Sequence, residues 1–445
     1  MKKLLIISIL LTISLPVISQ AISVETDASA VFPTTFSGTI VRNYNDLYAV
    51  GYLRDSVDGY FYSSAIEAFS IPSTLPFTLG TRMKLFNQWT IQDIQVHRNY
   101  IYFCGTDGSN HGLYGRFHIN DLLSPGIHNF IAYRFVDVKC LNKIVVVDTN
   151  SKTNLIAIGE GYNYAGVDHD VIIEVKDYNN YPTIPLIALM SAADLSHREI
   201  LQDVLVVGGK AIFVGMDTRT PFKTFFVRRS NKYNVVLDNE LHNTYHYTPA
   251  LSVGSVITSL STCSAVMEDK YVSIAHMCDN PPNGFNMLVN TIDALGYLNS
   301  ISVHMISHVN RAELVEMKYL PLVKNLVLLS YNGMYQTDFL IWNPGNTTTY
   351  TTTSSYENNI MYSSIDVLNN QSYISASKSH WFLQRTYPSI TPSYCKPSQN
   401  MQVQIVTPHE QSVIQEKPYI ETLTTTPIYV DVITTNIPLS INCQY

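Results

Sequence analysis

Hydrophobic and polar positions along the chain form short apolar runs that recur at nearly even intervals. The clearest run, residues 100–104, follows the turn-forming pair Arg98-Asn99 and ends at Gly105. Seven such runs occur, and the small residues that end them are Gly51, Gly105, Gly159, Gly215, Ala275, Ser330 and Ala376. Successive small residues lie 54, 54, 56, 60, 55 and 46 positions apart. Spacing this regular indicates an internal repeat.

Further runs of strand-forming residues accompany each copy. The downstream runs are residues 60–68, 113–119, 171–175, 224–227, 286–292, 338–342 and 381–383. The upstream runs, often with an acidic residue inside, are residues 92–94, 136–138, 202–204, 315–317 and 365–367. Runs separated by a few Asn, Asp or Gly residues predict hairpins. Three strands with room for a fourth, repeated seven times, predict an all-β, seven-bladed β-propeller over residues 22–390.

The runs suit that architecture. A middle strand covered on both faces by adjacent blades is apolar throughout rather than alternating. The small residue is expected where a strand end comes close to a neighbouring blade. Over roughly residues 30–390 the chain thus resembles seven-bladed β-propellers as an architecture. It lacks Trp-Asp endings, sialidase Asp-boxes, repeated kelch glycines and Tyr-Trp-Thr-Asp motifs, so the resemblance implies a fold and carries over no functional residue.

The two ends of the chain depart from the repeat. Residues 1–21 combine Lys2-Lys3, an apolar stretch at 4–18 and the small residues Ser19 and Ala21, which predicts a secretory signal peptide. Its apolar part is too short to span a membrane. We therefore expect a secreted, periplasmic or cell-surface bacterial protein without a transmembrane segment.

Residues 391–445 form a C-terminal extension with strands expected at 401–406, 419–424 and 428–433. This extension is interpreted either as a small β appendage or as a tail that wraps back to complete a blade. Residues 22–37 are expected to supply the outer strand of blade seven and so to close the ring, which removes exposed edges. The best helix candidate, residues 191–201, falls between blades three and four.

Composition and net charge argue against nucleic acid as a partner of this chain. Hydrophobic residues make up 46% of the chain, charged residues only 14%, and there are 30 tyrosines. The net charge of -7 gives no electrostatic footprint for nucleic acid. We expect a monomer that binds a glycan or a protein.

Six cysteines in an exported chain permit three disulfides. Proximity in the repeat predicts Cys263 with Cys278, Cys395 with Cys443, and Cys104 with Cys140. The alternative for the last pair is two buried thiols. The chain has no Cys-x-x-Cys motif for zinc or redox chemistry.

Motifs for catalysis are absent from the sequence. It has no Gly-x-Ser-x-Gly, no His-Glu-x-x-His, no phosphate-binding loop and no dinucleotide fingerprint, so no catalytic residue, metal or cofactor is assigned. The site is expected on the rim built by the loops after the second strand of each blade. The candidate ligand contacts are Tyr162, Tyr164, Asp168, Asp170, Asp107, Asp217 and His276.

Two readings of this rim remain open. Tyrosines that stack on a sugar and carboxylates that accept its hydroxyl protons suit a non-catalytic binding or scaffold protein. Carboxylates at the channel mouth suit a polysaccharide-directed hydrolase or lyase. Residues of these types are also common in ordinary turns.

Overall fold

The computed structural model describes residues 22–26, 34–43, 46–54, 62–70, 80–85, 89–124, 126–149, 152–161, 169–175, 186–190, 199–217, 224–229, 242–248, 256–279, 285–308, 313–331, 337–344, 350–355, 362–368, 372–377, 382–386, 399–401, 403–416, 419–422, 425–437 and 439–444. Antiparallel strands account for almost all of them, so the predicted all-β class is confirmed. Among these residues, no helix combines the length and the hydropathy needed to cross a membrane.

The strands form seven four-stranded units in chain order. Unit one consists of β2 (Thr34–Asn43), β3 (Asp46–Arg54), β4 (Tyr62–Ser70) and β5 (Gly80–Leu85). Unit two consists of β6 (Thr90–His97), β7 (Tyr100–Thr106), β8 (Gly112–His118) and β9 (Gly126–Phe135). Unit three consists of β10 (Val138–Thr149), β11 (Lys152–Gly161), β12 (His169–Val175) and β13 (Leu186–Met190). Unit four consists of β14 (Glu199–Val207), β15 (Lys210–Asp217), β16 (Thr224–Arg229) and β17 (His242–Thr248). Unit five consists of β18 (Val256–Met267), β19 (Tyr271–Asp279), β20 (Phe285–Asp293) and β21 (Ser300–His308). Unit six is β22 (Glu313–Leu320), β23 (Asn325–Tyr331), β24 (Thr337–Trp342) and β25 (Tyr350–Ser355). Unit seven joins β26 (Tyr362–Leu368), β27 (Ser372–Ser377) and β28 (Phe382–Thr386) to the N-terminal β1 (Ile22–Thr26), which pairs with β28 as the sequence predicts.

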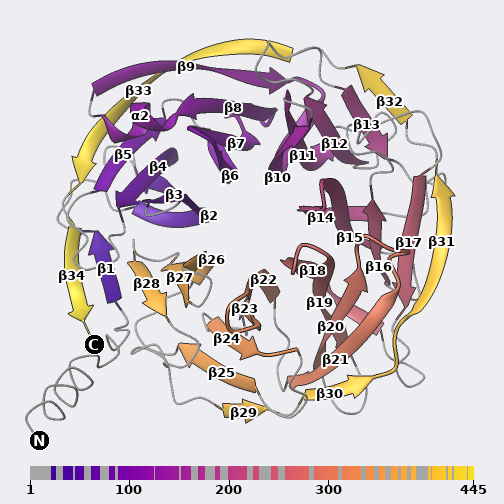
Figure 1. Ribbon diagram of the computed structural model, residues 1–445. Coiled ribbons are helices and arrows are strands. Elements are labelled where there is room, and N and C mark those ends of the chain that lie inside the picture. The colour runs from indigo at the N-terminus through magenta and orange to yellow at the C-terminus, as the bar shows by residue number, and fades with distance from the viewer. Residues whose placement is uncertain are drawn as a thin grey trace, which may run out of the picture.

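The units lie around a common centre (Figure 1). The first strand of each unit lies nearest the middle of the view, and the later strands follow outward. Each apolar run found in the sequence is the second strand of its unit.

The C-terminal strands form an outer layer that we call the belt. It comprises β29 (Gln399–Met401), β30 (Val403–Val406), β31 (Glu410–Glu416), β32 (Tyr419–Thr422), β33 (Thr425–Ile437) and β34 (Leu439–Gln444). These strands pair in turn with the outer edges of units six, five, four and three, then with units two and one together, and finally with unit seven. The belt therefore runs backward along the order of the units, on the outside of the ring (Figure 1). The C-terminal extension wraps back along the units, as the second of the two interpretations predicts, and it pairs with the outer edge of every unit.

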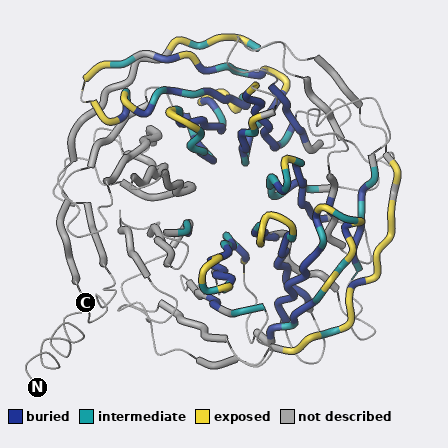
Figure 2. The backbone as a smooth tube through the Cα atoms, in the orientation of Figure 1, coloured by how far each residue is buried: buried dark blue, intermediate teal, exposed yellow. Residues whose placement is uncertain are grey.

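The second strands are apolar throughout because their two faces belong to different cores. In β11, Leu155 and Ala157 pack into the core between units two and three, whereas Ile156 and Ile158 pack into the core between units three and four. Successive side chains of a strand point to opposite faces, so each neighbouring unit receives every second residue. Most of the described second-strand residues are accordingly buried (Figure 2).

The small residue at the end of the second strand has a different cause from the predicted one. The first strand of its own unit, not a neighbouring unit, crowds it. Gly105 pairs with Ile91, where β6 has a β-bulge, and a Cβ on Gly105 would lie 2.9 Å from the Ile91 Cα and closer still to the Thr90 carbonyl oxygen. Gly51, Gly159, Gly215 and Ser330 pair with the residue before a bulge in the same way. In these five units the small residue thus marks a bulge in the first strand, which bends that strand, whereas Ala275 and Ala376 pair with residues that follow the irregularity.

The helix prediction was wrong where it can be compared. Residues 199–201 of the expected helix belong to β14, and residues 191–198 lie outside the described part. A short helix, α2 (Ile119–Leu123), follows β8 instead, with the His118 imidazole accepting a hydrogen bond from the Asn120 backbone. Its buried Ile119 and Leu122 pack against unit two.

Two of the predicted disulfides are absent. Cys104, Cys140, Cys263 and Cys278 are free thiols. Cys263 pairs with Ala275 of β19, three residues from Cys278, so the two thiols lie roughly 10 Å apart along the strand and on opposite faces, beyond disulfide reach. For Cys104 and Cys140 the alternative of two thiols holds, and Cys104 Sγ donates to the Leu141 carbonyl oxygen at 3.7 Å. Cys395 and the side chain of Cys443 lie outside the described residues.

Candidate functional site

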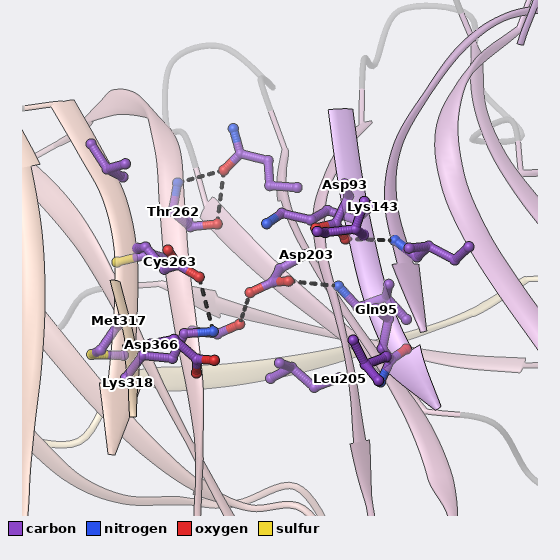
Figure 3. Close-up of a pocket in the computed structure, with 18 residues that line it drawn as sticks. Asp93, Gln95, Lys143, Asp203, Leu205, Thr262, Cys263, Met317, Lys318 and Asp366 are labelled. Atoms are coloured by element: carbon purple, nitrogen blue, oxygen red, sulfur yellow. Dashed lines mark hydrogen bonds and ion pairs between the residues drawn. The ribbon is translucent and has the colours of Figure 1, made fainter. Parts of the chain in front are cut away.

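The first strands of six units surround a cavity of about 360 Å³ at the centre of the ring. Its ionisable lining consists of the carboxyl groups of Asp93, Asp203, Glu316 and Asp366 and the amines of Lys143 and Lys318. Gln95, Gln202, Thr262 and Ser264 add amides and hydroxyls. Figure 3 shows Asp203 between Thr262 and Cys263 on one side and Asp93 and Gln95 on the other.

Several of these side chains tie one first strand to the next. The Ile144 backbone N–H of unit three donates to Asp93 Oδ2 of unit two at 2.9 Å. Likewise the Ile365 N–H of unit seven donates to Glu316 Oε2 of unit six at 2.9 Å. Two of the acidic residues in the upstream runs, Asp93 and Glu316, therefore accept a backbone hydrogen bond from the following unit.

Neutral side chains make the same type of tie. The Val146 N–H donates to Gln95 Oε1 at 2.5 Å, and the Thr262 N–H donates to Gln202 Oε1 at 2.5 Å. The Ser264 hydroxyl of unit five donates to the Asp203 carboxylate of unit four. These bonds hold the first strands at fixed spacing, so the cavity wall is preorganised.

The two lysines are charged cavity residues. Burial lowers the pKa of Lys143, but the carboxylates of Asp93, Asp203 and Glu316 outweigh burial and raise it above its usual value. Burial also lowers the pKa of Lys318, and Glu316 and Asp366 reverse that effect in the same way. The Lys318 Nζ lies 2.9 Å from Glu316 Oε1. Both amines are therefore ammonium groups at neutral pH.

Burial acts in the opposite direction on Asp203. It raises the pKa of this carboxyl group above its usual value, while Lys143 and the Ser264 hydroxyl oppose the rise. The cavity as a whole holds both hydrogen-bond donors and acceptors. Four carboxyl groups against two amines give it a formal excess of negative charge among the described residues.

Two of the predicted rim contacts are buried. Asp107 is buried: its carboxylate accepts from the backbone N–H groups of Ser109 and His111 at 2.8 and 2.9 Å and pairs with Arg134 Nε at 2.5 Å. His276 is fully buried in β19. Burial and these turn hydrogen bonds do not favour direct ligand contact by either residue.

The remaining rim residues cannot be compared at the level of side chains. Tyr162, Tyr164 and Asp168 lie outside the described residues. Asp170 is in β12 opposite Glu160, and Asp217 is at the end of β15 opposite Glu199, but the structure does not describe their side chains. Their role as ligand contacts stays a prediction.

Sequence reasoning missed the central cavity, although its signal was visible. The upstream runs around Asp93, Asp203, Glu316 and Asp366 are apolar strands with an acidic residue inside. An acidic residue within an otherwise apolar strand indicates a buried carboxylate that needs a partner. The rim loops were chosen instead because they contain more polar and aromatic residues.

Chemically, this cavity suits a polar ligand. Among the described residues, no group of three or more His, Cys, Asp or Glu side chains is arranged to hold a metal ion. No protein-family model and no curated protein sequence matches the chain.

Proposed function

We propose that this chain is an exported, non-catalytic binding protein, a closed seven-bladed β-propeller that binds a glycan in its central cavity and at the adjoining rim. The observation that carries the proposal is the cavity itself. Preorganised carboxylates, ammonium groups, amides and hydroxyls from six units converge in about 360 Å³.

The ring closure rests on strand pairing. β1 lies between β28 and β34, so the N-terminal strand completes unit seven in the manner of the other units. Each unit would then have a neighbour on both sides, which leaves no open face. The export part of the proposal rests on the signal-peptide pattern of residues 1–21.

A polyhydroxylated ligand fits the cavity better than an apolar peptide. Each sugar hydroxyl both donates and accepts, so it can bond to Lys143 or Lys318 and to a neighbouring carboxylate at once. An apolar side chain would remove water from these charged groups without replacing its hydrogen bonds, which is unfavourable.

The test combines a soluble oligosaccharide array with calorimetry. The double variant Lys143→Met/Lys318→Met removes both amines, and Lys139→Met is the matched control because Lys139 pairs with Glu160 outside the cavity lining. Loss of a charged hydrogen bond costs about 1.5–3 kcal/mol, so the double variant should bind at least roughly tenfold more weakly. The control should bind as the unmodified protein does.

Three outcomes would overturn parts of the proposal. Equal affinity in the double variant would remove the cavity from the site. Binding to proteins but to no glycan would change the ligand class. Release of new reducing ends from the bound glycan would favour the hydrolase or lyase. Replacing Tyr162, Tyr164, Asp168 and Asp170 together by Ala separately measures the contribution of the rim.

A further inference from the structure

The belt has one buried anchor among its described side chains. These side chains belong to residues 404–413, 415 and 425–429, and only His409 is buried. Ile405, Val413 and Tyr429 are exposed apolar residues of the belt. Val406 and Ile428 of the belt are half-buried and pack against core clusters of the units, and backbone pairing holds the other described belt residues, so His409 is the one buried point of attachment among them.

His409 lies where the belt passes from unit five to unit four. It follows β30, which pairs with β21, and it precedes β31, which pairs with β17. Its ring packs edge-on against His276 of β19, with the ring centroids 5.3 Å apart. The two imidazoles thus join the belt to the interior of unit five.

A hydrogen-bonded group lies beside this contact. The Tyr247 hydroxyl of β17 donates to the Leu298 carbonyl oxygen of unit five at 2.5 Å. The Gln411 amide of the belt donates to the same carbonyl oxygen at 3.1 Å. Ile274 of β19 and Tyr247 share one core cluster between units four and five. The segment from His409 to Gln411 is therefore fixed at the junction of these two units.

We propose that His409 and His276 form an acid-sensitive latch, which holds the belt on the junction of units four and five at neutral pH and releases it at mildly acidic pH. Protonation would place two positive charges in contact inside a buried site. Release would free the outer edges of β17 and β21 for pairing with another strand. The latch does not depend on the proposed glycan binding.

The described residues that pair with His276 carry no charge. Thr262 of β18 and Leu288 of β20 pair with His276 on either side, and neither titrates. Cys278 lies two residues along β19 on the same face, and Tyr247 lies on the facing strand β17. Glu410, the next belt residue, has an exposed side chain.

The direction of the pH effect follows from burial. Burial and the neighbouring His409 hold the pKa of His276 well below its usual value. Burial lowers the pKa of His409 to about 4. A released belt would regain a pKa of about 6.5, so it binds protons more readily than the docked belt. Docking of the belt is thus fully favoured above pH ~6.5 and weakens as the pH falls toward 4. The titration of His409 alone lowers the ratio of docked to released belt about 30-fold between pH 7.5 and pH 5.

Hydrogen exchange read by mass spectrometry tests the latch. Residues 403–416 are compared at pH 7.5 and 5.0, with exchange times scaled for the intrinsic rate, and β7 serves as the internal reference. The unmodified protein should lose protection in 403–416 by about 30-fold at pH 5, while β7 stays protected. His409→Phe, which keeps an aromatic ring and cannot titrate, should stay protected at both pH values.

The matched control is His304→Phe. His304 is a second buried histidine of unit five, and burial also lowers its pKa. This variant should keep the acid-induced loss of protection. If His409→Phe fails to fold, as judged by circular dichroism at pH 7.5, His276→Phe and His409→Gln replace it. Unchanged protection of the unmodified protein at pH 5, equal loss in β7, or the same pH response in the latch variants would each overturn the proposal.

Discussion

Gly105 provides the sharpest test of why the repeat has a small residue at one position. In Gly105→Ala the new Cβ would lie 2.9 Å from the Ile91 Cα and nearer to the Thr90 carbonyl oxygen. Carbon atoms pack best at about 3.5–4.0 Å, so the Ile91 contact alone requires the backbones of β6 and β7 to separate by roughly 0.6–1 Å, and the nearer Thr90 oxygen requires more. The obstacle is backbone on both sides, and no side-chain rotation can relieve it.

This separation has an energetic cost that can be estimated. Overpacking of a buried site costs about 1–3 kcal/mol, and a backbone obstacle belongs at the upper end, so we expect a loss of about 3 kcal/mol. The shift would also disturb Asp93, which follows the bulge and ties unit two to unit three. Urea denaturation followed by tyrosine and tryptophan fluorescence measures the loss.

Ser330→Ala is the control, because Ser330 occupies the equivalent position in unit six and already carries a Cβ. Its buried hydroxyl has no hydrogen-bond partner among the described residues, so its removal should change stability by less than about 1 kcal/mol. A Gly105→Ala protein as stable as Ser330→Ala would refute the explanation that the close approach of the β6 backbone at residues 90–91 requires a glycine at position 105.

Three further predictions concern the cavity and the thiols. Asp93→Ala leaves the Ile144 N–H without its acceptor and removes one of the carboxylates around the Lys143 amine, so it should lower the free energy of unfolding by about 3 kcal/mol, whereas Asp93→Asn keeps an acceptor and should lose less in the same urea titration. Because folding raises the pKa of Lys143, the charged amine contributes its full stabilisation below pH ~10.4 and less above it. In thermal melts from pH 9 to 11.5, the melting temperature of Lys143→Met should therefore fall less steeply with pH than that of the unmodified protein. Iodoacetamide mapping of the native protein should label the partly exposed Cys140 well before the buried Cys104, and equal labelling would contradict the burial of Cys104.

The parts of the fold that the sequence predicts are those with a hydrophobic signal. A second strand such as β11 is buried on both faces, so its apolar run is continuous and easy to recognise. The belt gives no comparable signal. β31 has the sequence Glu-Gln-Ser-Val-Ile-Gln-Glu, and it pairs with β17 through its backbone while its described side chains, residues 410–413 and 415, are exposed. Backbone pairing at an outer edge imposes little on the side chains, so the course of the belt was not predictable.

The candidate site shows a related limit. The position of Asp93 within a strand can be predicted from its apolar neighbours, but its partner cannot, because the Ile144 N–H lies 51 residues away in the next unit. The prediction of a Cys263–Cys278 disulfide was wrong for a reason of register. Cys263 and Cys278 lie on adjacent strands of one hairpin, yet an odd offset of three residues places them on opposite faces. The turn between Met267 and Tyr271 sets that offset, because the pairing from Met267–Tyr271 to Cys263–Ala275 is continuous.

The belt also imposes an order on biosynthesis. Chains emerge from the ribosome N-terminus first, and local hairpins such as β6–β7 can pair as soon as they are made. The outer edge of every unit must wait for residues 399–444, and β1 at residue 22 meets β34 only after the last strand is complete. Contacts of such long sequence separation form slowly. A ribosome that stops before residue 399 therefore releases a chain in which the outer edge of every unit is unpaired, so one C-terminal truncation exposes all of these edges to aggregation at once.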